Sequence, residues 1–262
     1  MSKKTKEVLN IDRWKRGGWL ADRPDQRDDD HAYQVKWDYS TPLPTKVDHR
    51  PTCPAIKDQG QLGSCVPHGI AFAMEYDELR QHEVYDRLSP LGLYYLIRVM
   101  EGTIDSDSGC MIRDGAKTVN KTGAGPESLW PYDIAKFTEH PPQGWYDAAK
   151  KSITYHSVPQ SLQAMKGVLA DGNLITIGFT VYQSFESQEV ADTGVVPMPA
   201  RHESVLGGHC VDVVGYDDSR QVWICANSWG TSWGDKGYFY MPYSYLTSRK
   251  LSSDFWVINT VQ

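Results

Sequence analysis

The sequence has no long apolar run and no excess of positive charge. No stretch approaches the roughly 18 consecutive apolar residues that a membrane-spanning helix requires, and the mean hydropathy is −0.50. The basic start Met-Ser-Lys-Lys-Thr-Lys is not followed by the apolar segment of a secretion signal. We therefore expect no membrane association and a location that is cytoplasmic or reached by a non-classical export route. The net charge of −6 gives no reason to expect nucleic-acid binding.

Cysteine is scarce and its count is odd. If Cys65 is a reactive thiol, the other four cysteines could pair in three ways. The missing secretion signal favours a reduced interior instead. The five residues are Cys53, Cys65, Cys110, Cys210 and Cys225.

The sequence also lacks a complete metal-binding motif. Asp105-Ser-Asp-Ser-Gly109 is typical of the start of a calcium loop, but Ala116 stands where a bidentate glutamate is needed. We expect a solvated loop there, and neither a metal nor a cofactor.

Apolar residues are nevertheless sufficient for a sizeable core. The 262 residues are 40% apolar and 11% aromatic, which indicates one globular unit or two lobes that share a cleft. Up to about Trp145 the pattern predicts helices over residues 65–80, 89–98 and 112–121. From Ile153 onward it predicts strands over residues 174–181, 210–216, 222–226, 237–241 and 255–261. A helix-rich first half and a strand-rich second half predict an α+β protein of two lobes.

The most informative segment is Asp58-Gln-Gly-Gln-Leu-Gly-Ser-Cys65, which the apolar run Ile70-Ala-Phe-Ala-Met74 follows closely. Pro67 fits the first turn of a helix, where a missing N–H is tolerated. The unpaired N–H groups at a helix start favour the thiolate, which is the reactive form of cysteine. A cysteine before an apolar helix is more often a core residue, so Cys65 alone would not indicate a nucleophile.

Two later segments supply a base and a group that orients it. Gly207-Gly-His209-Cys-Val-Asp-Val-Val-Gly-Tyr216 places a histidine at the start of a predicted strand. Asn227-Ser-Trp-Gly-Thr-Ser-Trp-Gly-Asp-Lys-Gly-Tyr238 begins with an asparagine. His209 can take the thiol proton of Cys65, and the Asn227 oxygen can accept from the other ring N–H. We expect Trp229 to lie over that hydrogen bond.

These residues resemble the catalytic set of the papain-like cysteine peptidases. In that family His and Asn follow the nucleophile by about 130–150 residues; His209 lies in that range and Asn227 slightly beyond it. Gln59 lies six residues before Cys65, the spacing of the family's oxyanion-hole glutamine. The block from Asn227 to Tyr238 matches the family's block, and Leu43-Pro-Thr-Lys-Val-Asp-His-Arg50 resembles its mature amino terminus.

The resemblance implies a two-lobed papain-like fold. In that fold a helix-rich first lobe and an antiparallel, β-barrel-like second lobe have the active-site cleft between them. Leu62 and Val66 replace a cysteine and a tryptophan that the family usually carries, and Cys110 resembles the disulfide partner of that missing cysteine, so this bridge cannot form. In these departures the chain is similar to the bacterial and viral branch, and to the xylellain-type enzymes with a short amino-terminal extension.

Residues 1–42 differ in composition from the peptidase domain predicted over residues 43–262. Basic residues dominate the first sixteen positions, and Asp28-Asp-Asp30 follows. The aromatic residues Trp14, Trp19, Tyr33 and Trp37 interrupt this polarity. The extension is either a surface-draped arm or an inhibitory, propeptide-like arm whose aromatics anchor it across the cleft.

The resemblance implies a thiol endopeptidase that forms an acyl-enzyme on peptide or protein substrates, and we expect a monomer. An acyl transferase or transpeptidase with the same thioester chemistry remains an alternative. A catalytically retired binding protein is another, although it would not need all four of Gln59, Cys65, His209 and Asn227. Glycines in the predicted substrate surface can pair with an extended peptide and leave room for an apolar side chain. That surface comprises Gly63, Ser64, Ser108, Gly109, Cys110, Gly178, Gly207, Gly208 and Trp229.

Overall fold

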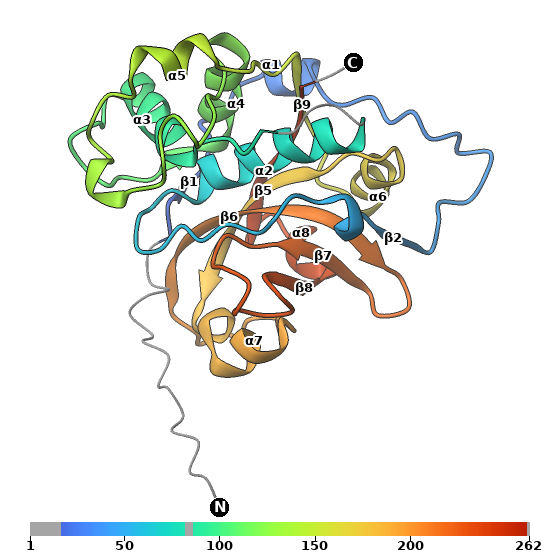
Figure 1. Ribbon diagram of the computed structural model, residues 1–262. Helices are drawn as coiled ribbons and strands as arrows, with labels where there is room; N and C mark the ends of the chain where they lie inside the picture. The colour runs from blue at the N-terminus through green and yellow to red at the C-terminus, as the bar shows by residue number, and fades with distance from the viewer. Residues whose placement is uncertain (1–16, 82–85, 261–262) are drawn as a thin grey trace, which may run out of the picture.

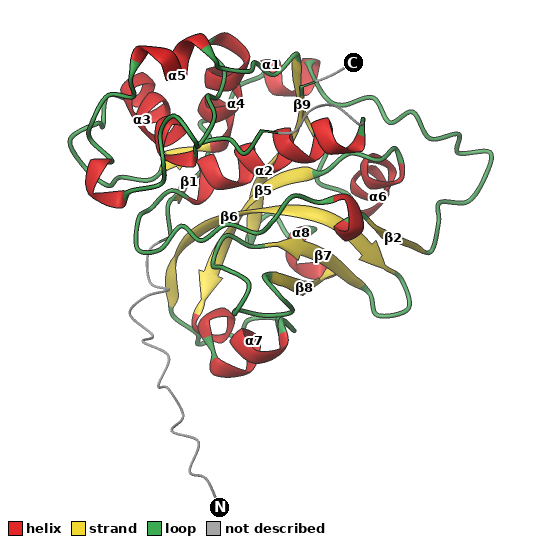
Figure 2. Ribbon diagram, viewed as in Figure 1, coloured by secondary structure: helices red, strands yellow, loops and turns green. Residues whose placement is uncertain are grey.

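A computed structural model describes residues 17–81 and 86–260; the basic start of the chain and Trp14 lie outside the described residues. One long helix, α2 (Cys65–Arg80), runs through the middle of the molecule. Helices α3 (Pro90–Glu101), α4 (Ile112–Lys121) and α5 (Gln143–Asp147) gather on one side of it, and most of the large sheet lies on the other (Figure 1; Figure 2). This arrangement confirms the predicted α+β fold of two lobes.

The large sheet has seven strands, and every neighbouring pair is antiparallel. Its order is β4-β9-β5-β6-β7-β8, with β2 paired to β6. The strands are β2 (Lys46–Asp48), β4 (Thr154–Ser157), β5 (Ile175–Tyr182), β6 (Val205–Asp217), β7 (Val222–Ala226), β8 (Tyr238–Pro242) and β9 (Ser252–Asn259). The short helices around it are α6 (Leu162–Ala170), α7 (Gln188–Thr193) and α8 (Tyr243–Leu246), with 3-10 turns at Arg50–Thr52, Ile134–Lys136 and Gln183–Glu186.

The sequence predicted three helices that the structure contains. Helix α3 begins as expected, because the Ser89 hydroxyl accepts a hydrogen bond from the Gly92 N–H at 3.2 Å and Pro90 takes the first helical position. Helix α2 is buried around its whole circumference from Cys65 to Glu78, since it packs against helices on one side and the sheet on the other.

Gly69 allows α2 to approach the sheet closely. A Cβ atom at this position would lie 3.2 Å from the Cys210 sulfur and 3.3 Å from Thr176 Cγ2. The close approach brings the start of α2 beside the first half of β6. The two elements that carry Cys65 and His209 therefore meet at the junction of the lobes.

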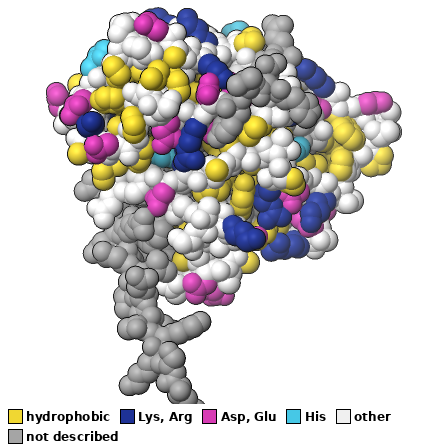
Figure 3. All heavy atoms as spheres, viewed as in Figure 1, with side chains coloured by type: hydrophobic (Ala, Val, Ile, Leu, Met, Phe, Trp, Pro, Cys, Tyr) yellow, Lys and Arg dark blue, Asp and Glu magenta, His cyan; other side chains and the backbone are white. Residues whose placement is uncertain are grey.

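Strands β2 and β4 were not predicted from the sequence. The predicted strand over residues 210–216 begins five residues after the actual start of β6 at Val205. These short or partly exposed strands have little apolar alternation of their own, and pairing with β6 and β9 fixes them. All five cysteines lie within the described ranges, and none of them is in a disulfide. Over the same ranges, the helices are all too short or too polar to cross a membrane. Acidic, basic and apolar side chains are interspersed on the face in Figure 3.

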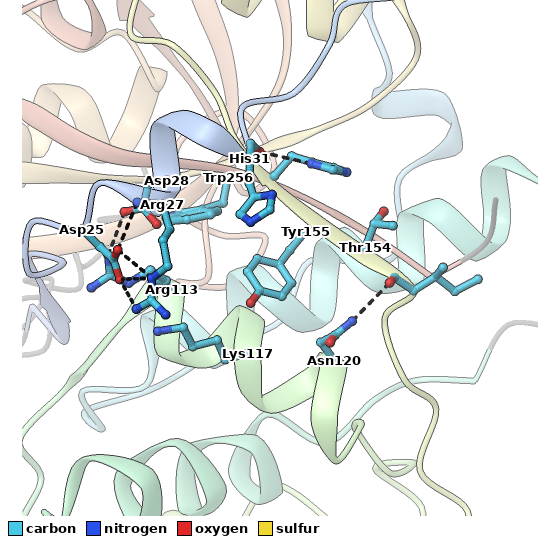
Figure 4. A pocket seen from close by; sticks show the side chains of 12 residues that line it. Asp25, Arg27, Asp28, His31, Arg113, Lys117, Asn120, Thr154, Tyr155 and Trp256 are labelled. Atoms are coloured by element: carbon cyan, nitrogen blue, oxygen red, sulfur yellow. Dashed lines mark hydrogen bonds and ion pairs between the residues drawn. The ribbon is translucent and has the colours of Figure 1, made fainter.

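Residues 17–42 lie along the body of the protein. Strand β1 (Trp19–Leu20) pairs in parallel with β3 (Cys110–Met111). The one-turn helix α1 (Arg27–Asp30) follows, and its Asp28 carboxylate binds Arg113 of α4 at 2.7 Å (Figure 4). Farther on, the backbone N–H of Tyr33 donates to the Ser157 oxygen of β4 at 2.7 Å. The arm is thus tied to both lobes.

Candidate active site

Cys65 is the first residue of α2 and is completely buried. Burial raises the pKa of its thiol to about 11, while backbone hydrogen bonds from Cys210, Gly18 and the helix start at Val66 act in the opposite direction. The helix start therefore favours the thiolate as expected, but burial outweighs it. In this state Cys65 is a neutral thiol at physiological pH.

His209 and Asn227 are joined by a hydrogen bond of 2.8 Å between His209 Nε2 and Asn227 Oδ1. The same amide oxygen accepts from the backbone N–H of Ser228 at 2.8 Å, which establishes that Oδ1 is the acceptor. His209 Nε2 must then carry the proton. Its other ring nitrogen, Nδ1, is buried and has no hydrogen-bond partner among the described residues, so it is the nitrogen that can accept a proton from a thiol.

Aromatic rings enclose this pair. The Trp229 indole stacks on the His209 ring, with centroids 4.8 Å apart and planes inclined by 29°. The Phe179 ring packs edge-to-face with the imidazole, with centroids 5.7 Å apart, and Phe185 packs against Trp229 at 5.5 Å. The resulting burial lowers the pKa of His209 to about 4, although its bond to Asn227 acts the other way. The imidazole is therefore neutral in this state.

Gln59 is held by hydrogen bonds of both its side chain and its backbone. Its Oε1 accepts from the Ser228 hydroxyl at 2.6 Å, and its Nε2 donates to the Leu62 oxygen at 2.9 Å. Its backbone oxygen accepts from the Tyr132 hydroxyl at 2.9 Å. One N–H of the amide can still bind another acceptor. Ser228, which immediately follows Asn227, links the orientation of Gln59 to that of the His209 partner.

The chain's own arm covers this site. A Cβ atom on Gly18 would collide with the carbonyl oxygen of Gly63, and one on Gly17 would collide with the backbone of Gly208. The N–H of Cys110 donates to the Gly18 oxygen at 2.8 Å. Gly18 itself is buried. Only residues without a side chain fit between the two lobes at this point.

Trp19 fills the space beside the next glycines. Its ring lies where a Cβ on Gly178 or Gly208 would be placed. Its indole N–H donates to Asp254 Oδ2 at 3.0 Å. Five glycines predicted to contact substrate thus lie against arm residues 17–19 instead: Gly63, Gly109, Gly178, Gly207 and Gly208.

The structure gives two predicted substrate residues other hydrogen-bond partners. The Ser64 hydroxyl lies 2.5 Å from the Tyr132 hydroxyl, and the Ser108 hydroxyl donates to Thr103 Oγ1 at 2.9 Å. Both side chains are therefore engaged within the helical lobe. Trp229 is 4% exposed and lies over His209, so it forms a wall against the imidazole ring.

Several supporting residues escaped the sequence analysis. Asp107 accepts from the Gly63 N–H at 2.9 Å and from the Tyr94 hydroxyl at 2.6 Å, which fixes the loop before Cys65. Its place in a loop rich in aspartate suggested only a calcium turn. Ser228 carries no sequence signal for its role beyond its position next to Asn227, and Tyr132 carries none. In the described part of the chain, no three His, Cys, Asp or Glu side chains gather as a metal site would require.

Comparisons with known proteins found similar sequences and structures. The family described as papain family cysteine protease matches residues 43–253. The chain is 42% identical over 215 residues to an uncharacterized peptidase C1-like protein of Acanthamoeba polyphaga mimivirus, with 78% of this chain and 69% of the relative covered. It is 30% identical to cathepsin L1 of Drosophila melanogaster, where the match covers 76% of this chain and only 54% of the relative.

Solved structures give the same picture. Xylellain, a cysteine protease from Xylella fastidiosa, is similar with a TM-score of 0.87 and 35% identity, over 95% of this chain and 98% of that one. Digestive procathepsin L 3 of Tenebrio molitor shares the fold, with a TM-score of 0.71 and 19% identity over 95% of this chain and 77% of the other.

Proposed function

The chain belongs to the papain family of cysteine proteases, and from this premise we propose that it is a thiol endopeptidase whose amino-terminal arm inhibits it. The hydrogen bond between His209 Nε2 and Asn227 Oδ1 is the main support for the proposed peptidase activity. Because this bond uses Nε2, His209 Nδ1 is left to act as the base. The next residue in the chain, Cys210, forms a backbone hydrogen bond to the Cys65 sulfur.

In the proposed reaction, His209 Nδ1 takes the proton of the Cys65 thiol. The resulting thiolate attacks the carbonyl carbon of the scissile peptide bond, and the carbonyl oxygen gains the negative charge. The Gln59 amide and the Cys65 backbone N–H donate hydrogen bonds to that oxygen. His209 then protonates the leaving amine as the C–N bond breaks, and an acyl-enzyme remains. His209 then takes a proton from a water molecule, which attacks the acyl carbon. The C–S bond breaks, the acid is released, and His209 returns the proton to the Cys65 thiolate.

The inhibitory part rests on the path of the arm. Gly18 donates a backbone hydrogen bond toward the Cys65 sulfur, so an N–H group faces the nucleophile where a substrate carbonyl would have to lie. Trp19 occupies the space over Gly178 and Gly208. Arm and substrate cannot be bound together. The burial that the arm contributes also favours the neutral forms of Cys65 and His209, and release would let water stabilise the ion pair.

Hydrolysis of a fluorogenic peptide panel by the full chain and by a Gly18→Ala variant tests both parts. The variant should cleave peptides faster, and Cys65→Ala in either background should abolish turnover. If Gly18→Ala has no effect on a chain that is already active, the arm does not inhibit. If neither chain hydrolyses peptides but added amines capture an acyl group, the chemistry is that of an acyl transferase.

A further inference from the structure

Two carboxyl groups meet where the arm passes over the sheet. Asp254 of β9 accepts two hydrogen bonds from the arm at its Oδ2 atom, from the backbone N–H of Asp22 at 2.8 Å and from Trp19 Nε1 at 3.0 Å. The Asp22 side chain binds the body in turn: Oδ1 accepts from the backbone N–H of Arg113 at 3.1 Å, and Oδ2 from Trp256 Nε1 at 2.9 Å. The anchor next to Trp19 thus brings two acidic groups together in a partly buried position.

The backbone holds Asp254 in this place. The residue has a φ of 59°, in the left-handed region, where β9 shifts its register against β5. This bulge turns the carboxylate of Asp254 toward the arm instead of along the regular strand.

Nearby cations do not neutralise the two carboxylates. The Arg113 guanidinium of α4 lowers the pKa of both carboxyl groups only as a minor cause. It pairs with Asp28 at 2.7 Å and approaches Asp25 at 3.9 Å. Arg23 and Arg249 only line the open cavity of about 560 Å³ beside Asp22 and Asp254. Within the described ranges, neither Asp22 nor Asp254 makes an ion pair, so two negative charges would face each other if both were ionised.

We propose that Asp22 and Asp254 share one proton when the arm is docked, and that this pair is a latch that holds the arm at acidic pH and loosens as the pH approaches neutrality. The inference rests on the proposed inhibition by the arm. It adds a regulatory input, because the strength of inhibition would then report the pH of the surroundings.

Linkage gives the direction of the effect. Burial and the Asp254 charge raise the pKa of Asp22 from 3.8 to about 7, whereas release of the arm would restore its ordinary value. The docked state therefore binds the proton more tightly. Its extra stability is fully present below about pH 4 and is lost as the pH rises through 7. Between these limits the equilibrium constant for docking falls by about tenfold per pH unit.

His209 would act in the opposite direction and must be removed from the test. Burial lowers its pKa to about 4 in the docked state, so a lone imidazole would lose a proton on docking. The measurement therefore uses the full chain with Cys65→Ala and His209→Ala, which also prevents self-cleavage.

Hydrogen exchange of the Cys110 amide measures docking directly, because that N–H donates to the Gly18 oxygen. After correction for intrinsic exchange, we expect its protection factor to fall about 50-fold between pH 5 and pH 7. Asp254→Asn should make the profile shallower but not flat, because it removes the neighbouring charge while burial still raises the pKa of Asp22. The amide oxygen can still accept from Trp19 and Asp22, and asparagine tolerates a positive φ. Asp105→Asn, which removes an exposed carboxylate on the loop after α3, should keep the slope of the parent.

The outcomes separate the latch from the proposed function. Protection that is high but independent of pH in the parent chain overturns the latch and leaves docking of the arm intact. A slope that is unchanged in Asp254→Asn also overturns the latch. Absence of protection at every pH overturns docking itself, and with it inhibition by the arm, while peptidase activity is judged separately by hydrolysis.

Discussion

The backbones of Gly18 and Gly63 lie in direct contact, so that a Cβ atom on Gly18 would overlap the carbonyl oxygen of Gly63. Gly63 belongs to the loop that presents Cys65, and the Asp107 carboxylate fixes it through its N–H. The loop cannot move away cheaply. Any side chain at position 18 must therefore displace the arm.

Gly18→Ala should accordingly activate the enzyme. Overpacking of this kind costs about 1–3 kcal/mol, which corresponds to roughly 5- to 150-fold more open chain. The rate of hydrolysis of a fluorogenic peptide at low substrate concentration measures the change. Gly144→Ala is the matched control, because no atom lies within 4 Å of a Cβ at Gly144. Equal activation by both substitutions would contradict the steric argument.

The reactivity of Cys65 should depend on the arm in a pH-dependent way. In the full chain the thiol pKa of about 11 keeps the thiolate rare, so alkylation by iodoacetamide should rise about tenfold per pH unit from pH 7 to 10. In Gly18→Ala the rate should be much higher at pH 7 and nearly level. Peptide mapping by mass spectrometry separates Cys65 from Cys53, the least buried of the other cysteines. Matching profiles for the two chains would show that the arm does not control the thiol.

The sequence predicted most of the fold because its signals were local. The Ser89 cap, Pro90 and the apolar period of α3 lie within a few residues of one another, and the structure has the helix there. Strand β4 depends on pairing with β9, some hundred residues later in the chain. Local propensity contains no information about such a partner.

The candidate site, too, could be predicted from the sequence only in part. Gln59, Cys65, His209 and Asn227 could be picked out because a family resemblance specified their spacing. Whether the arm inhibits was left open, because nothing in Gly17-Gly18-Trp19 reveals that it lies on Gly178 and Gly208. The aspartates at positions 22 and 254 come together only through the docked arm.

Gln59→Ala should reduce kcat far more than it changes KM. Loss of one donor to an oxyanion costs about 3 kcal/mol, or roughly 10²- to 10³-fold in kcat. Ser228→Ala should have a smaller effect, since it removes only the hydroxyl that holds Gln59 Oε1. Both variants are measured in the Gly18→Ala background, where the site is open. An unchanged kcat in Gln59→Ala would contradict the proposal that this glutamine stabilises the oxyanion.

Lys57 and Glu75 form a buried ion pair between the loop before Cys65 and the middle of α2. Burial raises the pKa of Glu75 and lowers that of Lys57, while the contact between the two groups acts in the opposite direction on each. Lys57→Met should lower the free energy of unfolding by about 3–5 kcal/mol, because it leaves a buried carboxylate without its counter-ion. Urea denaturation monitored by circular dichroism measures this loss.

The double variant Lys57→Met/Glu75→Gln provides the control for that prediction. The glutamine oxygen can still accept from the Leu88 N–H, which Glu75 binds at 2.7 Å. Most of the lost stability should return, since no buried charge remains. A double variant as unstable as Lys57→Met alone would mean that packing of the lysine stem, rather than charge, is responsible.

Asn227 should act through the orientation and charge of His209. Asn227→Ala removes the acceptor that holds His209 Nε2–H, so the imidazole can rotate or change tautomer, and kcat/KM should fall between roughly 10- and 1000-fold. Asn227→Asp keeps an oxygen at that position and adds a negative charge beside the ring. It should retain more activity than Asn227→Ala, and the charge should raise the pKa of His209 and move the basic limb of the pH–rate profile up by roughly one unit. The pH dependence of kcat/KM in the Gly18→Ala background measures both effects. A basic limb that stays in place in Asn227→Asp would mean that His209 is not the group whose deprotonation ends activity.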